Sequence, residues 1–439
     1  MEGQNTTDAT QTILGDYRQY IFPAVTPFYG DHPLIVDRAK GSVIWDTEGN
    51  CYLDFFGGVL TVSVGHCNEE VTERTIRQMR RVQHTSTLYI NEAMVRVARK
   101  IADLTPGRLQ KCLFTNSGSE ANETAIMAAR MYTGNREVIT LRHAYAGRTM
   151  TTMSLSGHGA WRLGGVFDSH IRHVRAPYTY RAPVGLDEKG LVDLCVQDLE
   201  ETLATTTDGR IAAFMAEPIQ GVGGFIVMPR DYFKQILPLV REAGGVFICD
   251  EVQTGWGRTG KYFCGIEHWG VDPDIITFAK GTANGSPIGV TIATPEIADA
   301  VKGLTFATFG GNPVTMTAAL ATIDYIERHR LTENAEVQGR RLRDCLNALR
   351  MKHSFVGDVR GMGLMQAMEI VESRCSGSKR PDPVRTVDLI NAARKNGLLV
   401  GKGGLCNNVI RIAPHLTVTQ EEMADGCSRL SRALADIDS

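Results

Sequence analysis

The stretch PDIITFAKGTANG, residues 273–285, joins a short apolar run to a glycine-rich turn and places Lys280 at the junction. The run is rich in β-branched residues and has the length of a buried strand. A lysine at this point is either a solvated strand end or a desolvated amine. A desolvated amine loses its charge readily and can then act as a nucleophile or a base. The segments around it decide between these two possibilities.

Two further apolar runs, IAAFMAEPI (211–219) and GGVFICDE (244–251), contain Glu217 and Asp250 at their ends. The stretch between them, residues 229–245, has the pattern of a helix closed by a glycine pair. This order predicts an α/β fold with a mostly parallel central sheet and covering helices. Since such sheets bind ligands at the carboxyl ends of their strands, Glu217, Asp250 and Lys280 are expected at one edge.

The stretch LFTNSGSEANETAIMAARM, residues 113–131, reads as a strand end followed by an amphipathic helix. Small residues at a helix start leave backbone N–H groups free to bind an anion, and the helix dipole adds to the attraction. Ser117, Gly118 and Ser119 are therefore candidates for a phosphate cradle. A serine that only caps the helix is the alternative.

Asp250 ends an apolar strand, where a lone carboxylate is costly. It needs a positive partner, which a protonated ring nitrogen would supply, and Gln253 could hydrogen-bond the same ring. A lysine, an acid and a phosphate cradle at one sheet edge indicate pyridoxal 5′-phosphate (PLP), which pairs a Schiff-base lysine with an acid at the pyridine nitrogen. Each piece alone has a purely structural explanation.

Three regions are expected along the chain. Residues 1–70 contain a hairpin-like stretch, GSVIWDTEGNCYLDFF (41–56), and belong to a small domain. Residues 71–312 form the large cofactor-binding domain. Residues 313–439 begin with a long bridging helix and complete the smaller α+β domain.

The composition argues against several classes of protein. The net charge is −2 without a long basic run, so neither nucleic acid nor an anionic membrane surface is an expected partner. No stretch approaches the roughly 20 apolar residues of a membrane span. Ten cysteines without a C-x-x-C pair predict reduced thiols and a cytoplasmic location. HIRH (170–173) lacks a third ligand, so no metal site is predicted.

Eight blocks resemble the class III aminotransferases of the fold-type-I PLP enzymes, over residues 20–435 and in the family's order. They are DFFGGVLTVSVGHCN, NSGSEAN, HAYAGRTM, AEPIQGVGG, DEVQTGWGRTG, FAKGTANGSPIG, TFGGNP and RIAPHLTVT. YLDFFGGVLTVSVGHCN and HTSTLY are most similar to alanine–glyoxylate aminotransferases of the mitochondrial type and their ω-amino acid relatives.

The resemblance implies roles for residues around PLP. Lys280 would hold it as a Schiff base, Asp250 would pair with the pyridine nitrogen, and Gln253 with the ring oxygen. The other cofactor contacts implied are Ser117, Gly118 and Ser119 to the phosphate, Tyr145 stacked on the ring, and Thr308 to the phosphate of a neighbouring subunit. The last contact implies a homodimer with shared active sites, and a tetramer is also possible.

The resemblance also implies a substrate pocket. Arg148 would bind a substrate carboxylate, Glu217 and Arg411 would act as a switch between unlike substrates, and Val59 would shape the wall. Arg411 in a dry pocket needs an anion, which a diacid substrate or Glu217 could supply. Ala146 departs from the bulkier residue common in relatives, which removes one wall contact of the ring.

The implied function is an aminotransferase that moves an amino group from an amino acid, ω-amino acid or amine to pyruvate, glyoxylate or 2-oxoglutarate by ping-pong kinetics. Lys280 and Asp250 would be its catalytic residues. The alternatives are a decarboxylating transaminase of dialkylglycine type, an amino-alcohol phosphate phospholyase and an aminomutase. A PLP-binding scaffold and a nicotinamide dehydrogenase are different classes, and no G-x-G-x-x-G follows a strand to support the latter.

Overall fold

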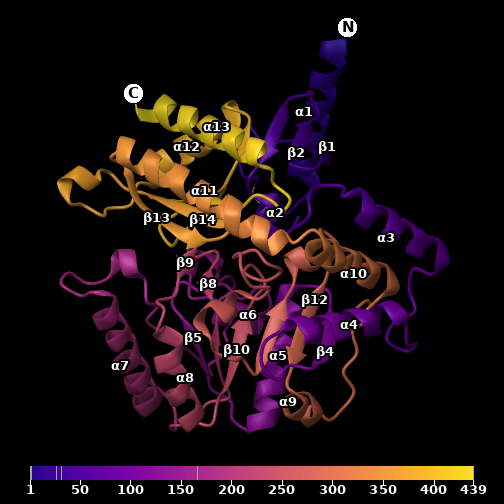
Figure 1. Cartoon of the computed structure of the whole chain (residues 1–439), viewed down its shortest axis with the longest axis vertical. Helices are drawn as coiled ribbons and strands as arrows, with labels where there is room; N and C mark the ends of the chain where they lie inside the picture. The colour runs from indigo at the N-terminus through magenta and orange to yellow at the C-terminus, as the bar shows by residue number, and fades with distance from the viewer. Residues whose placement is uncertain (1, 26, 31, 166, 439) are drawn as a thin grey trace.

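The computed structural model describes residues 2–25, 27–30, 32–165 and 167–438 of the chain. Its centre is a seven-stranded sheet in the order β4-β12-β11-β10-β7-β5-β6 (Figure 1). In that order the strands are Lys111–Thr115, Gly289–Ala293, Ile275–Phe278, Val246–Asp250, Ala213–Ala216, Val138–Leu141 and Ile171–Val174. The expected mostly parallel sheet is confirmed, because only β12 pairs antiparallel with both of its neighbours.

Both faces of this sheet are buried, as near-continuous apolar strands require. Val246 and Ile248 of β10 belong to an apolar cluster with residues of α5 (Gly118–Thr133). Phe247 and Cys249 belong to a second cluster with residues of α7 (Glu188–Thr206) and α8 (Tyr232–Glu242). Since successive side chains of a strand point to opposite faces, α5 covers one face and α7 with α8 the other.

A second layer of structure combines the two ends of the chain. The expected hairpin is present as β2 (Val43–Asp46) and β3 (Cys51–Asp54), and β1 (Val36–Lys40) extends it. β15 (Leu398–Leu399) pairs parallel with β3, so residues 345 positions apart share one sheet. The domain boundaries at residues 70 and 312 stay predictions, although the pairing of β3 with β15 supports the joining of the two ends.

The C-terminal third carries a second four-stranded sheet and its helices. β13 (Val356–Met362), β14 (Met365–Ile370), β17 (Val409–Ile412) and β16 (Gly401–Gly403) form a four-stranded sheet in that order. The expected bridging helix is α10, Pro313–Arg328. The helices around these strands are α11 (Leu331–Lys352), α12 (Pro383–Lys395) and α13 (Gln420–Asp438), which lie at the upper left of Figure 1.

The other helices complete the frame. α3 (Glu69–Arg81) and α4 (Glu92–Leu104) pack on α10, and α9 (Pro295–Ala300) packs on α5. α1 (Glu2–Tyr20) extends away from the body at the top of Figure 1. Among the described residues, no helix combines the length and the apolar character that crossing a bilayer would require.

Gly426 of α13 gives a test of how the two ends of the chain pack. A Cβ atom at this position would lie less than 3.0 Å from the ring of Phe55, which is 2% exposed. Gly426→Ala should therefore lower the free energy of unfolding by about 1–3 kcal/mol through overpacking, partly offset by better helix propensity. The measurement is the thermal unfolding midpoint.

Gly15→Ala in α1 is the matched control, because that glycine is also helical and a Cβ there would meet nothing within 4 Å. Its midpoint should stay unchanged or rise slightly. Equal midpoints for both variants would contradict the close packing of α13 on the N-terminal segment.

Candidate active site

A pocket of about 260 Å³ lies where the central strands β10 and β11 end. It is lined by Thr61, Asn116, Ser117, Gly118, Ser119, Asn122, Tyr145, Ala146, Gly147, Glu217, Asp250, Val252, Gln253, Ala279, Lys280, Gly285, Ser286, Pro287 and Ile288. Glu217 follows β7, Asp250 is the last residue of β10, and Lys280 comes two residues after β11. The carboxyl ends of parallel strands thus bring the three charged residues together, as their positions in the sequence predicted.

The carboxylate of Asp250 is buried and receives two N–H hydrogen bonds. Oδ1 accepts from the backbone of Val252 at 3.0 Å, and Oδ2 accepts from Nδ2 of Asn122 at 2.9 Å. The pKa of Asp250 is raised from its ordinary value by burial, and these two hydrogen bonds and the charge of Lys280 oppose that rise. Within the described ranges no basic side chain comes within 4.0 Å of this carboxylate, so the positive partner that it needs is left to a ligand.

Lys280 is held in a strained backbone conformation. Its φ of +40° lies in the left-handed region, which residues with a side chain rarely adopt. The following turn is fixed by Asn284, whose side chain accepts a hydrogen bond from the backbone of Val64 at 2.9 Å and donates to the carbonyl of Gly65 at 3.0 Å. Such strain persists only where the surroundings impose it, and it is frequent at functional sites.

The pKa of Lys280 is lowered from its ordinary value. Burial is the largest cause, the charge of Arg411 acts in the same direction, and the carboxyl groups of Asp250 and Glu217 oppose them. A neutral amine is therefore available at a lower pH than on an exposed lysine, which suits a nucleophile or a base.

One end of the pocket is formed by the start of α5 and by backbone that packs closely against it. Ser117 caps α5 by accepting a hydrogen bond from the backbone of Glu120, so Gly118 begins the helix at the pocket wall. The side chain of Ser119 accepts from the backbone of Arg148 at 3.0 Å. Gly147 has φ +143°, and a Cβ there would lie less than 3.0 Å from Ser119. This end offers free backbone N–H groups at a helix start, which is the environment an anionic phosphate prefers.

Gln253 gives the test of whether PLP fits. Its Oε1 atom is buried and has no hydrogen-bond partner among the described residues. A Cβ at Gly221 would collide with this amide, so the glycine leaves the room that Gln253 occupies. A buried amide without a partner in a polar pocket indicates that a ligand atom completes its bonding. With Asp250, Lys280 and the helix start of α5, the residues present fit a phosphorylated pyridine aldehyde.

Glu217 and Arg411 lie close together but are not joined by an ion pair within 4.0 Å in the part of the chain that the structure describes. Glu217 accepts from the backbones of Gly221 at 2.7 Å and Tyr145 at 3.2 Å. Burial, followed by the charge of Asp250, raises the pKa of Glu217 to about 8.

Arg411 is buried in surroundings without an anion in contact. It donates to the carbonyls of Lys402 at 2.9 Å and Gly221 at 3.3 Å. Its guanidinium carbon lies 5.0 Å from the ring centre of Phe56 and 5.6 Å from that of Phe225, so two aromatic faces stabilise the cation. Burial lowers the pKa of Arg411 to about 10. The Gly221 backbone thus lies between the acid and the arginine and bonds to both.

Four predicted residues do not line the pocket. Arg411 lies behind it, and Arg148, Thr308 and Val59 are exposed. Tyr145 and Ala146 do line it, and Tyr145 packs edge-on against Trp161 at 5.4 Å between ring centres. The roles of all these residues stay predictions.

Asn122, the donor to Asp250, was not predicted. It lies on α5, 128 residues before Asp250, and is 1% exposed. Its only signal in the sequence was a polar residue on the inner side of an otherwise apolar helix face, beside Ala121 and Ala125. Thr61 of the N-terminal segment is a second lining residue that the sequence did not single out.

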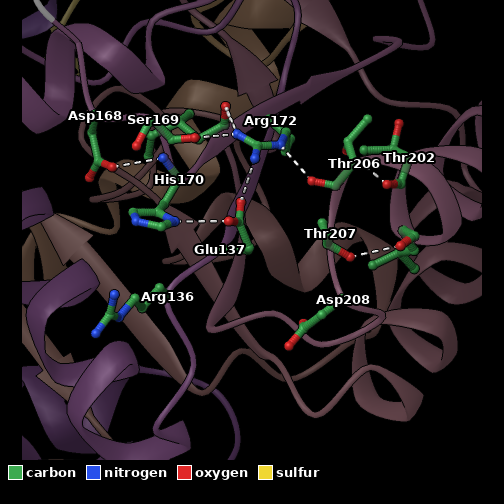
Figure 2. Close-up of polar contacts among 12 residues, drawn as sticks. Arg136, Glu137, Asp168, Ser169, His170, Arg172, Thr202, Thr206, Thr207 and Asp208 are labelled. Carbon is green, nitrogen blue, oxygen red and sulfur yellow. Dashed lines mark hydrogen bonds and ion pairs between the residues drawn. The ribbon is translucent and has the colours of Figure 1, made fainter.

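The opposite end of the sheet carries a group of ion pairs. Figure 2 shows His170 and Arg172 directed to Glu137; the ion pairs join them to its carboxylate at 2.9 Å for His170 and 3.3 Å for Arg172. Arg172 also donates to the carbonyl of Thr206, at the end of α7. His173 of the HIRH stretch instead faces the carbonyl of Leu155. The described residues contain no group of three or more His, Cys, Asp or Glu suited to a metal.

Comparisons with known proteins identify the family and the fold. The family described as Aminotransferase class-III matches residues 26–434. The chain is 39% identical over 418 residues to an alanine–glyoxylate aminotransferase 2 homolog 2, mitochondrial, of Arabidopsis thaliana, covering 95% of this chain and 86% of that protein. The crystal structure of an (S)-enantioselective ω-transaminase from Thermomicrobium roseum superposes with a TM-score of 0.91 at 35% identity, over 98% of this chain and 99% of that one.

A phospholyase from Arthrobacter, solved with phosphoethanolamine, is also similar, with a TM-score of 0.89 at 31% identity over 96% of this chain and 99% of that one. The expected fold class and the resemblance seen in the sequence are both confirmed by these matches.

The lowered pKa of Lys280 gives a prediction that does not depend on turnover. In protein freed of cofactor, acylation of Lys280 should rise and level off at a lower pH than acylation of Lys189, since only the neutral amine reacts. Lys189 is the control because its contact with Asp193 raises its pKa. Peptide mapping by mass spectrometry against pH measures each profile separately, so differences in access cancel. A Lys280 profile at or above that of Lys189 would contradict a desolvated amine.

Proposed function

The chain belongs to the class III aminotransferase family and is a PLP-dependent transaminase, and we propose that it moves an amino group from an amino acid or ω-amino acid to a 2-oxo acid. Pyruvate, glyoxylate and 2-oxoglutarate are the proposed acceptors. The observation that carries the proposal is the convergence of Asp250, Lys280 and an unpartnered Gln253 amide on one pocket beside a helix start.

When bound, PLP withdraws electrons from the substrate carbon that loses a proton. Asp250 keeps a proton on the ring nitrogen, because an ionised carboxylate in a buried pocket stabilises a neighbouring cation strongly. The two N–H donors to its oxygens fix the direction of that carboxylate.

Lys280 would hold the cofactor through Nζ. Its pKa is lowered by burial and by Arg411, so the free amine would be a neutral base in the pocket. In that form Nζ would be the group that takes the proton from the substrate carbon that bears nitrogen. The strained backbone at Lys280, fixed by Asn284, holds the amine at the pocket wall.

The phosphate end is held by backbone. The N–H groups at the start of α5, at Gly118 and Ser119, are the proposed donors, supported by the helix dipole. Ser117 is engaged in capping, so we propose that its backbone contributes more than its side chain.

Arg411 is the proposed anchor for a substrate carboxylate. It retains its charge between two aromatic rings and two carbonyls without an anion in contact. Glu217 bonds to the backbone N–H of Gly221 and Arg411 to its carbonyl, so no ion pair between the two side chains would have to break for a substrate carboxylate to join the arginine. Arg148, at the exposed edge near Tyr145, is proposed as a second carboxylate contact.

A homodimer with shared sites is the proposed assembly. Thr308 is exposed and does not reach the pocket of its own chain. Large apolar side chains around it are also exposed, with Leu304, Phe306 and Phe309 at 106%, 56% and 61%. Clusters of this kind mark protein–protein contacts. We propose that this segment meets the pocket of a second copy.

Phospholysis of an amino-alcohol phosphate is the second candidate, because a phospholyase shares the fold. Transamination requires an acceptor and releases no inorganic phosphate, so the two reactions are separable in one assay. A panel of amino donors with each of the three oxo acids, together with a phosphate assay on phosphoethanolamine, decides between them.

Lys280→Ala should abolish transamination and the visible absorbance of the bound cofactor, because no other lysine lines the pocket among the described residues. Lys234→Ala, an exposed lysine of α8, is the control and should keep both. Donor consumption and absorbance spectra of the purified proteins measure the effect. A Lys280→Ala enzyme that keeps both its colour and its activity would contradict the assignment of Lys280 as the cofactor-binding residue.

Shared sites predict complementation between two inactive variants. Lys280→Ala and Thr308→Asp should each be inactive alone, the second because it puts a negative charge against a phosphate. Mixed dimers would hold one site with an intact lysine and an intact threonine, so activity should return after the subunits are mixed and refolded. No recovery, despite mixed dimers seen by mass spectrometry, would show that Thr308 acts in its own subunit or in none.

A further inference from the structure

A row of polar side chains crosses three central strands beneath the pocket. Asp250 of β10 pairs with Thr277 of β11, which in turn pairs with Thr291 of β12. Paired residues on neighbouring strands point to the same face of the sheet. Val246 and Ile248 lie an even number of residues from Asp250, as Ile275 does from Thr277, so they share that face, and all three belong to the apolar cluster on the α5 side. All three polar side chains therefore face α5.

Asn122 of α5 bridges the first two members of this row. Its Nδ2 donates to Oδ2 of Asp250 at 2.9 Å and to the carbonyl of Ala146 at 2.8 Å. Its Oδ1 accepts from the hydroxyl of Thr277 at 2.7 Å. A backbone carbonyl only accepts hydrogen bonds, so the Asn122 atom next to the Ala146 carbonyl must be the nitrogen. The same nitrogen contacts Asp250, so Asn122 presents a donor to that carboxylate.

This arrangement selects one protonation state of Asp250. An amide N–H₂ and a backbone N–H are donors only, and they occupy one position on each carboxylate oxygen. An ionised Asp250 accepts both N–H bonds with its full charge, which strengthens them, whereas a protonated one would have to direct its hydrogen away from both donors. Each oxygen keeps one acceptor position, and one of these can receive a ring N–H in the pocket.

We propose that Asn122 is a positioning residue that keeps Asp250 ionised and directed at the cofactor's ring nitrogen, and that Thr277 holds the amide of Asn122 in place. The inference rests on the proposed function, because it concerns the ring nitrogen of PLP. Asn122 acts through Asp250. Lys280 attracts this carboxylate, while the nearby acids Glu217 and Glu251 repel it, and Arg411 acts on Lys280 and Glu217 from behind them.

The test compares two ligands with the cofactor-free protein. One is PLP, and the other is its carbocyclic analogue, in which C–H replaces the ring nitrogen. An ionised Asp250 stabilises the first and is left unpaired by the second, so the ratio of their dissociation constants reports the state of Asp250. A general loosening of the pocket would weaken both ligands and leave the ratio unchanged.

Asn122→Leu removes the amide donor to Asp250 and leaves the Val252 N–H in place, while nearly keeping the side-chain volume. We expect the ratio of dissociation constants, analogue over PLP, to fall at least about tenfold from its wild-type value, since hydrogen bonds to charged groups contribute this much. Equilibrium titration followed by protein fluorescence gives both constants, and circular dichroism checks the fold.

Thr277→Val keeps the test decisive if Asn122→Leu does not fold. It removes only the hydroxyl that holds the amide, and the ratio should fall about twofold to fivefold. Thr291→Val is the matched control: its hydroxyl is equally buried on the next strand and donates to the carbonyl of Ala121, not to Asn122. Its ratio should equal that of the wild type.

A wild-type ratio retained in Thr277→Val, or in a folded Asn122→Leu, would overturn the inference, and so would an equal fall in Thr291→Val. Failure of the proposed function looks different, because the donor and acceptor panel would then show no amino transfer while the ratio of dissociation constants could still be measured.

Discussion

The carboxylate of Asp250 lies in the interior, accepts two N–H hydrogen bonds and has no basic side chain within 4.0 Å across the residues that the structure describes. A charge in that position is destabilising unless a cation joins it. The pocket opens directly onto this carboxylate and has Lys280 in its wall, with a lowered pKa. A cofactor that brings a ring cation and an aldehyde satisfies both residues at once, which explains why the two are found together.

The fold supplies this juxtaposition through strand ends. β7, β10 and β11 run in parallel, so Glu217, Asp250 and Lys280 emerge at one edge, while α5 begins at the same edge and turns its free N–H groups inward. The N-terminal segment reaches the pocket at Thr61 and is joined to the turn after Lys280 by the hydrogen bonds of Asn284 with Val64 and Gly65. The sheet containing β17 brings Arg411 to the far side, where the backbone of Gly221 separates it from Glu217.

Much of this could be predicted from local patterns. Apolar runs ending in Glu217, Asp250 and Lys280 indicated three strands and their shared edge, and the small residues at 117–119 indicated the helix start. Asn122 could not be found in this way, because its role depends on the pairing of Asp250 with Thr277, which no single segment reveals. The two-residue alternation of strand side chains did indicate which residues of each strand share a face. It did not show that Asp250 on one strand lies beside Thr277 on the next.

The exposed residues show a different limit on what the sequence can predict. Arg148, Thr308 and Val59 were assigned by resemblance alone, and one chain does not bring them to the pocket. Their roles stay proposals, for Thr308 a contact with the pocket of a second copy and for Arg148 a contact with a substrate carboxylate. Residues placed by strand register were predictable from the chain itself, whereas a role that needs a partner or a ligand cannot be read from one chain.

The most direct measurement is the nitrogen-15 chemical shift of the ring in protein loaded with PLP labelled at that atom. If Asp250 is ionised and directed at the ring, the shift will be that of a protonated pyridine throughout the neutral pH range. A shift characteristic of an unprotonated ring nitrogen would contradict the account.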